Sequence, residues 1–366
     1  MITASTLTRQ PPTPALAATA TPAAHWQREL AQAVSDPLEL CRLLQIDPQL
    51  ALGADTAGAG FRLRVPRGFV ARMRRGDARD PLLLQVLPGR QELIEQAGFG
   101  ADPLAEAGAM RVPGLLHKYH GRALLITTGA CAIHCRYCFR REIPYASAHA
   151  QGARWRAALA HIAADHSIEE LILSGGDPLS LSTSRLAQLT DSLRALPHIR
   201  RLRLHTRTPV VLPERVDDEL LAWIGALPWP CVIVLHSNHA NEIDATVRAA
   251  AARLRAAGAT LLNQSVLLAG INDSAAALHA LSLALWSAGV LPYYLHLLDR
   301  VRGAAHFEVD ETRARELMAA LATRLPGYLL PRLAREVPGA TAKMVLAPSA
   351  PAASWDGLHS EVMRGW

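Results

Sequence analysis

The sequence predicts an α/β fold, namely a partial (β/α)6 barrel that follows an N-terminal helical region. Two observations predict it. From about residue 115, short apolar runs alternate with long amphipathic stretches, which is typical of strands alternating with helices around a parallel sheet. There are six such units, fewer than the eight of a closed barrel. The 366 residues, about half of them apolar, are enough to bury one large core.

The chain divides into four predicted segments. Residues 1–24 consist mainly of Thr, Pro and Ala, so we expect a disordered tail, with a transit peptide as the alternative. Residues 25–110 are the helical region, residues 111–345 the barrel, and residues 346–366 a C-terminal tail. No apolar run is long enough for a transmembrane helix.

The N-terminal region contains short helix patterns separated by Pro and Gly. The first covers residues 26–34. Ser35-Asp36-Pro37 then supplies cap residues and a proline suited to the first turn of a second helix. In that second helix, Cys41 is predicted to be a buried apolar residue. Further short helices are expected over residues 69–73 and 91–96.

The barrel pattern predicts six strands and six helices. The strands are expected over 123–127, 170–174, 202–205, 231–236, 261–268 and 293–298. The helices are expected over 152–166, 181–195, 214–226, 240–257, 274–288 and 310–324.

Polar side chains lie on or directly after each predicted strand. Active sites of parallel α/β barrels form at the carboxyl ends of the strands, so these segments should meet at one mouth. That convergence predicts an enzyme rather than a simple binding module. The segments are 131–138, 174–178, 205–207, 236–242, 263–265 and Asp299.

Three of the five cysteines occupy one loop, as Cys131-x3-Cys135-x2-Cys138. Three thiolates can hold one face of a metal cluster and leave one iron open, whereas closed zinc sites and fully ligated clusters use four ligands. An odd number of cysteines, three of them this close, indicates metal chemistry in a reducing, cytoplasmic compartment. A zinc loop completed by His134 or His149, and an electron-transfer cluster, are the alternatives.

Only two of the 38 basic residues are lysines, Lys118 and Lys343. An arginine stays protonated, whereas a lysine amine can lose its proton and form a Schiff base, so at least one of the two is a candidate for that role. The net charge of +6 is spread along the chain, with no basic run beyond residues 200–203. This distribution argues against direct nucleic-acid binding and suits anionic cofactors.

The cysteine loop, with Tyr137 before its last cysteine, resembles the radical S-adenosylmethionine (SAM) enzymes. That resemblance implies a [4Fe-4S] cluster whose open iron binds SAM, and an electron donor that reduces it. Gly175-Gly176-Asp177 after the second strand allows close backbone approach, and it resembles the superfamily's contact with the methionyl amino group of SAM.

Within that superfamily, residues 112–345 resemble the lysine 2,3-aminomutases. The N-terminal segments 36–47 and 80–87 are most similar to the branch that acts in β-lysylation of elongation factor P. The absence of further cysteines after Cys231 also favours that shorter branch, because the free-lysine mutases carry additional zinc-binding cysteines. The barrel motifs are 117–122, 138–141, 263–273, 293–299 and 338–343.

The resemblance implies roles for the cofactor residues. Pyridoxal 5′-phosphate (PLP) is expected on Lys343, which follows a Pro-Gly turn, with Lys118 as the rival. Lys118 and Arg122 correspond to the phosphate contacts, and two such cations could clamp a dianion. His236 and Gln264 correspond to positions near SAM.

The resemblance also implies how lysine is bound. Arg140 corresponds to the partner of the substrate carboxylate, and Asp299 to a partner of the ε-ammonium. Glu336 corresponds to the second acid, where the free-lysine mutases are expected to have Asp. The longer side chain keeps the charge but changes the reach.

The resulting prediction is an isomerase that converts L-lysine to β-lysine, functionally linked to elongation factor P and its lysine ligase, and without membrane contact. A homo-oligomer is a further expectation. Three alternatives stay open: a free L-lysine 2,3-aminomutase, a mutase for another amino acid such as glutamate, and a non-catalytic iron–sulfur protein.

Overall fold

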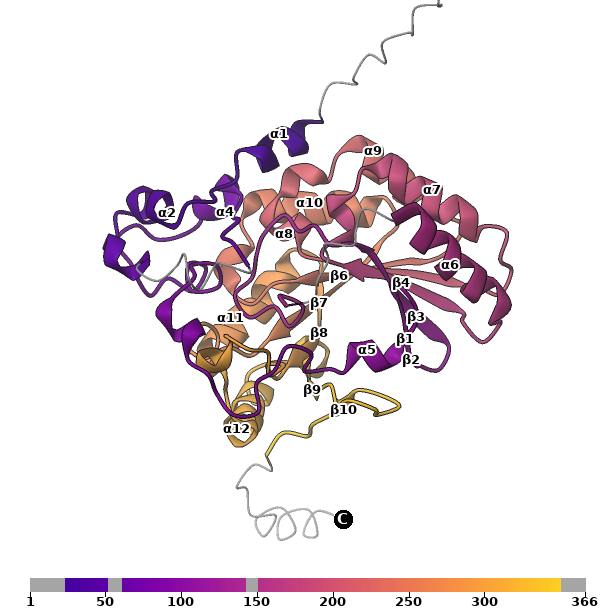
Figure 1. The fold of residues 1–366 in the computed structure, drawn as a ribbon. Coiled ribbons are helices and arrows are strands. Elements are labelled where there is room, and N and C mark those ends of the chain that lie inside the picture. The colour runs from indigo at the N-terminus through magenta and orange to yellow at the C-terminus, as the bar shows by residue number, and fades with distance from the viewer. Residues whose placement is uncertain (1–23, 52–60, 143–150, 350–366) are drawn as a thin grey trace, which may run out of the picture.

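A ten-stranded sheet runs through this computed structural model, which describes residues 24–51, 61–142 and 151–349. The strands follow one another in sequence order. Seven are parallel, and antiparallel strands extend both edges (Figure 1). Within the described residues the two edge strands do not pair, so the barrel is open, as predicted. The strands are β1 (Met110–Val112), β2 (Leu115–Tyr119), β3 (Arg122–Thr128), β4 (Glu170–Gly175), β5 (Arg201–Thr206), β6 (Cys231–His236), β7 (Thr260–Val266), β8 (Leu291–His296), β9 (Arg332–Arg335) and β10 (Met344–Val345).

All six predicted strands are present as β3 to β8. The sequence missed β9, the seventh parallel strand, because it has only two buried residues, Leu333 and Ala334, between two arginines. It also missed β1, β2 and β10, which are short and lie on the sheet edges. The chain therefore continues the barrel beyond the six predicted units.

All six predicted barrel helices are present and lie outside the sheet (Figure 1). They are α6 (Gln151–Ala164), α7 (Thr183–Leu193), α9 (Asp218–Gly225), α10 (Ala245–Ala256), α11 (Ala275–Ser287) and α12 (Glu311–Ala322). The helices predicted over 214–226 and 240–257 begin four and five residues later, since separate 3-10 turns precede them. The short helix α8 (Thr208–Val211) follows β5.

Side-chain caps fix where four of these helices begin. Asp217, Asp244, Ser274 and Asp310 each accept a hydrogen bond from the backbone N–H three residues further on. Such caps satisfy amide groups that the first helical turn leaves without partners, and each stabilises by about 1 kcal/mol. The caps thereby set the length of the loops between strand and helix.

The N-terminal region consists of short helices joined by irregular chain. They are α1 (His25–Ala31), α2 (Pro37–Leu44), α4 (Arg67–Val70) and α5 (Glu106–Ala109). The helix predicted over residues 91–96 is wrong, because the structure has only a 3-10 turn, Arg90–Leu93. Glu92 in this turn is buried in ion pairs with Arg136 and Arg141, so contacts with the cysteine loop shape the segment rather than a helical repeat.

The N-terminal region and the barrel share one hydrophobic core. Trp26, Leu40 and Leu82 belong to the same cluster of buried side chains as Leu173 and Ile233 of the sheet. Cys41 is buried there, as predicted. The apolar packing continues across residue 110. The domain boundary predicted there therefore stays a prediction.

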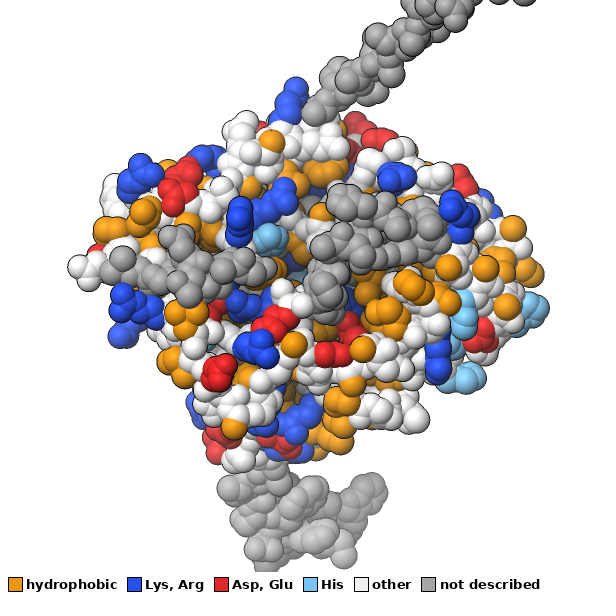
Figure 2. All heavy atoms as spheres, viewed as in Figure 1, with side chains coloured by type: hydrophobic (Ala, Val, Ile, Leu, Met, Phe, Trp, Pro, Cys, Tyr) orange, Lys and Arg blue, Asp and Glu red, His pale blue; other side chains and the backbone are white. Residues whose placement is uncertain are grey.

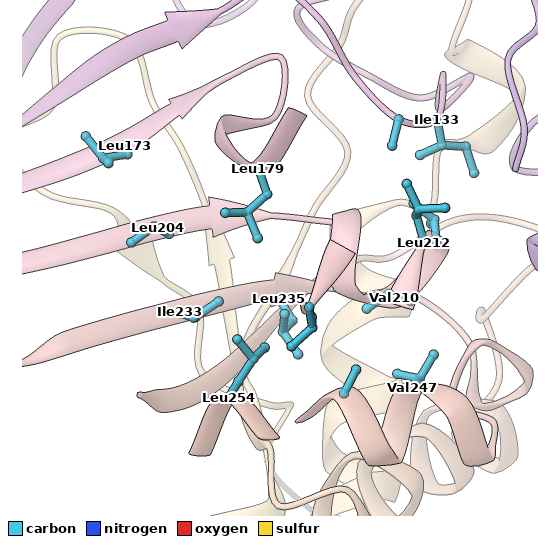
Figure 3. Close-up of a cluster of buried hydrophobic side chains, with 14 of the residues drawn as sticks. Ile133, Leu173, Leu179, Leu204, Val210, Leu212, Ile233, Leu235, Val247 and Leu254 are labelled. Carbon is cyan, nitrogen blue, oxygen red and sulfur yellow. The ribbon is translucent and has the colours of Figure 1, made fainter. Parts of the chain in front are cut away.

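The core also anchors the loop that carries the three cysteines. Leu173, Leu204 and Ile233 of β4, β5 and β6 belong to one cluster of buried side chains with residues of α8 and α10, such as Val210 and Val247 (Figure 3). Ile133 of the cysteine loop reaches the same cluster and is 4% exposed. Burying such a side chain stabilises by about 1.5–3 kcal/mol, so the loop is fixed to the barrel by its own apolar residue.

Most of the two predicted tails, 1–24 and 346–366, lies outside the described residues, although Leu346 is buried. No helix in the described part of the chain is long and apolar enough to span a bilayer. On the face seen in Figure 2, basic and acidic side chains are interspersed. That face therefore carries no continuous basic stripe of the kind expected for nucleic-acid binding.

Candidate active site

A cavity of about 480 Å³ lies inside the barrel and reaches the carboxyl ends of its strands. Its size is in the usual range for small-molecule sites. Every site residue that the sequence pointed to lines this one cavity, so the predicted convergence is confirmed, while the roles of the residues stay predictions. They are Lys118, Arg122, Cys131, Cys135, Cys138, Arg140, Gly175, Gly176, Asp177, His236, Gln264, Asp299, Glu336 and Lys343.

A structural zinc ion on the cysteine loop would need a fourth protein ligand beside the three cysteines. His134, the proposed fourth zinc ligand, binds the Arg62 carbonyl through Nδ1 at 2.6 Å and stacks on Phe61. His149 lies outside the described residues.

The Gly175-Gly176 pair is required by the backbone of the cysteine loop. A Cβ at Gly175 would lie 2.5 Å from the Thr128 carbonyl oxygen, and one at Gly176 only 2.3 Å from that of Ala130. The Gly176 N–H donates to the Thr128 carbonyl at 2.7 Å. The close backbone approach that these glycines allow is made, in the structure, between the loops that follow β3 and β4.

Asp177 joins these two loops to the end of β5. One carboxylate oxygen accepts hydrogen bonds from the Thr206 hydroxyl at 2.6 Å and the Leu179 N–H at 3.0 Å. The other accepts from the N–H groups of Arg207 and Thr208, at 2.7 and 3.0 Å. Asp177 thus fixes the loops after β3, β4 and β5 in one arrangement.

Arg207 contacts the cysteine loop directly, and the sequence gave it no role. Its Nη1 lies 2.7 Å from the Cys135 sulfur and 2.6 Å from the Tyr137 hydroxyl. Its Nη2 donates to Gln85 and Glu242, at 2.7 and 2.9 Å. A buried cation held by a buried carboxylate therefore faces one of the predicted metal ligands.

The Tyr137 hydroxyl is the meeting point of this network. It lies 2.8 Å from Nε2 of His236 and accepts from the Asn238 amide at 2.7 Å. Burial, together with nearby Arg207, lowers the pKa of His236 to about 3. His236 is therefore a neutral hydrogen-bonding group in the cavity wall, and Gln264 is its neighbour on β7.

Arg140 forms a two-pronged ion pair with Glu106 of α5, with N···O distances of 2.9 and 2.7 Å. It also donates to the Ser174 hydroxyl and the Gly175 carbonyl, at 3.2 and 3.3 Å. Planar pairing of this kind fixes the guanidinium plane. The sequence did not single out Glu106, because a lone acid in a short helix has no distinguishing pattern.

Lys343 is far from the three cysteines in the sequence, but it lines the same cavity. Its Nζ is 3.3 Å from Nε2 of His296 and 5.1 Å from the centre of the Tyr294 ring. Burial lowers the pKa of Lys343, although Glu336 and Asp299 act in the other direction. A lower pKa makes the neutral, nucleophilic amine more accessible.

Glu336 lies between the two lysines of the chain. Its carboxylate is 3.1 Å from Nζ of Lys118 and 3.8 Å from Nζ of Lys343. Burial opposes ionisation of Glu336, but the two lysines hold its pKa below the usual value. Beside it, burial and repulsion from Glu336 raise the pKa of Asp299 to about 7.

Comparisons with known proteins agree with this site. Residues 120–204 match the family described as "4Fe-4S single cluster domain". The chain is 50% identical over 322 residues to the L-lysine 2,3-aminomutase of Escherichia coli (strain K12), covering 88% of this chain and 94% of that one. It is 44% identical over 323 residues to the L-lysine 2,3-aminomutase of Haemophilus influenzae, covering 88% and 96%.

The chain belongs to the radical SAM lysine 2,3-aminomutase family. The chain also resembles the solved structure of a radical SAM methyltransferase from Sphaerobacter thermophilus, with a TM-score of 0.40 and 16% identity, covering 60% of this chain and 68% of that one. Membership of the family rests on the sequence relatives. The lysine 2,3-aminomutase family consists of isomerases.

The cavity suits the cofactors expected of a lysine 2,3-aminomutase family member. Burial raises the pKa of Cys138 to about 11, so its thiolate needs a strongly cationic group such as an iron cluster beside it. Lys343 offers an amine, and Lys118 and Arg122 offer cations for a phosphate. His205 also lines the cavity, and its buried Nε2 has no hydrogen-bond partner among the described residues, which leaves a polar group for a bound molecule.

Proposed function

We propose that this protein converts L-lysine to β-lysine by moving the amino group from Cα to Cβ, and that the product serves β-lysylation of elongation factor P. The observation that carries the proposal is one cavity lined by three cysteines, a lysine of lowered pKa, an arginine and two acids. The relatives named L-lysine 2,3-aminomutase support lysine as the substrate.

The residues would divide the work as follows. Cys131, Cys135 and Cys138 hold a [4Fe-4S] cluster, with its open iron toward SAM. Lys343 holds PLP through its amine. When bound, the cluster and SAM supply hydrogen-atom abstraction, and PLP carries the migrating amino group.

Charge pairing would orient the substrate between the two cofactors. Arg140 pairs with the lysine carboxylate, and Glu106 keeps its guanidinium plane in place. Asp299 and Glu336 pair with the ε-ammonium. Binding of the PLP phosphate at Lys118 gives that lysine a new partner, which releases Glu336 from its present ion pair toward the substrate.

The link to elongation factor P rests on the N-terminal region. Its segments 36–47 and 80–87 carry the resemblance to that branch. Gln85, within the second segment, hydrogen-bonds Arg207 and Asn238 beside the cysteine loop. The resemblance of these segments supports membership of that branch. The branch in turn implies elongation factor P and its lysine ligase as partners.

The experiment is an anaerobic assay of the reconstituted enzyme. With dithionite, SAM, PLP and L-lysine we expect β-lysine, detected by chromatography. Lys343→Ala should abolish the visible absorbance of bound PLP, while Lys118→Ala should weaken PLP binding but keep that absorbance. Loss of the absorbance in Lys118→Ala alone would assign the PLP site to Lys118 instead.

The same assay separates the alternatives. A mutase for another amino acid would turn over glutamate or alanine faster than lysine. A non-catalytic iron–sulfur protein would neither bind PLP nor cleave SAM on reduction. To test the elongation factor P link, the product is supplied to the lysine ligase with elongation factor P. Attachment no better than with α-lysine would favour a free L-lysine 2,3-aminomutase.

A further inference from the structure

A second cluster of metal-binding side chains lies outside the cavity. Among the described residues, His117, His161 and Asp165 form the group whose ligand atoms all lie within 4.8 Å of one another. His117 is on β2, His161 is in the last turn of α6, and Asp165 directly follows that helix. None of the three lines the cavity, and the proposed function gives them no role.

Two of these side chains are held in place by further contacts. One oxygen of Asp165 accepts hydrogen bonds from the Ser167 hydroxyl and N–H, at 2.6 and 3.0 Å. The other oxygen lies 3.5 Å from Nδ1 of His117. Contacts of this kind orient metal ligands and fix the tautomer of a metal-binding histidine.

The positions of the three residues follow from the secondary structure. His161 and Asp165 are four residues apart, so they lie on one face at the end of α6. On β2, His117 precedes Lys118, and neighbouring side chains of a strand point to opposite faces of the sheet. Lys118 faces the cavity, and His117 faces Asp165 on the outer side.

We infer that His117, His161 and Asp165 bind one Zn²⁺ ion, which ties α6 to the strand that carries Lys118. Two imidazoles and a carboxylate are ligands that zinc takes in proteins. Zinc bonds of about 2.1 Å place the ligand atoms roughly 3.4 Å apart, so separations of up to 4.8 Å close by rotation of half-buried side chains. Three protein ligands leave one position for water.

The test uses tag-free enzyme with its iron cluster in place, dialysed against zinc-free buffer and titrated with ZnCl₂. We expect one zinc per chain by elemental analysis, nitrogen and oxygen ligands without sulfur by X-ray absorption, and a higher thermal midpoint. His161→Ala should weaken zinc binding at least ~100-fold, beyond the 10–100-fold that loss of a supporting contact costs. Asp165→Asn should weaken it comparably.

The matched control is His166→Ala, which removes an exposed histidine beside Asp165 that is not part of the cluster and should leave zinc affinity unchanged. Circular dichroism of the zinc-free variants checks that each one folds. The inference fails if the parent enzyme binds zinc no more tightly than His161→Ala. A zinc–sulfur signal in X-ray absorption would also overturn the inference, as would an equal loss of zinc affinity in His166→Ala.

Discussion

At the scale of single residues, one buried carboxyl group of the cavity lowers the stability of the folded protein. Asp299 is a buried carboxyl group whose pKa is raised to about 7 by burial and by Glu336. In an unfolded chain the pKa of Asp is about 3.9. Between these two values the folded protein binds more protons than the unfolded chain, so this carboxyl group lowers stability as the pH rises from about 4 to 7.

The apoprotein of Asp299→Asn should therefore gain stability over the parent as the pH rises. The expected gain is small at pH 5 and reaches at most about 4 kcal/mol at pH 8. Urea unfolding of both proteins at the two pH values measures it. Asp218→Asn, whose side chain is 98% exposed, is the control. A difference between Asp299→Asn and the parent that does not grow with pH contradicts the prediction.

Arg207 is the second residue whose contacts predict a measurable property. Its guanidinium lies 2.7 Å from the Cys135 sulfur, and a hydrogen bond from a cation stabilises the more negative, reduced state of a cluster bound there. In Arg207→Gln combined with Glu242→Gln, which removes both buried charges, the midpoint potential should fall by on the order of 60 mV. Arg207→Lys, which keeps the charge, should change it less.

An electrochemical titration followed by electron paramagnetic resonance measures this potential. Iron content per chain separates a change of potential from a loss of the cluster. An unchanged or higher potential in the double variant would show that Arg207 serves only to neutralise Glu242.

At the scale of elements, the loops after β3 and β4 are packed backbone against backbone. In Gly176→Ala, the new Cβ would lie 2.3 and 2.7 Å from the carbonyl oxygen and carbon of Ala130, and backbone atoms cannot move aside as a flexible side chain can. We expect a loss of about 1–3 kcal/mol in stability and a lower iron content. Thermal unfolding and iron analysis measure the two effects.

Gly68→Ala provides the matched control, because a Cβ at Gly68 has no atom within 4 Å. Gly68 is in α4, where Ala is favoured over Gly by about 0.5–1 kcal/mol, so that variant should be slightly stabilised with normal iron content. Normal iron content and stability in Gly176→Ala would show that the loops can separate.

The sequence predicted the elements better than their contacts. The six barrel units follow from apolar periodicity, which is a local property. Strand β9 was missed because its burial comes from its neighbour β8 rather than from its own pattern. Glu106 and Arg207 were missed for a related reason, since their importance arises from partners 34 and 72 residues away, and no spacing rule links such positions.

At the scale of the whole molecule, the N-terminal region and the barrel depend on each other. They share one core. Glu92 of the N-terminal region also forms buried ion pairs with Arg136 and Arg141 of the cysteine loop. We therefore expect one cooperative unfolding transition in urea, with tryptophan fluorescence and circular dichroism coinciding. Two separate transitions would instead support an independent unit over residues 25–110.

The placement of the two lysines has a practical consequence. Lys118 and Lys343 are the only side-chain amines in the sequence, and both line the cavity. Amine-selective labelling therefore becomes a footprint of this one site, with only the N-terminal α-amine as a background signal. Label counted by mass spectrometry should fall at Lys343 when PLP is bound, so occupancy can be read without any assay of turnover. Coupling the protein to a support through its amines should, by the same chemistry, block the cavity.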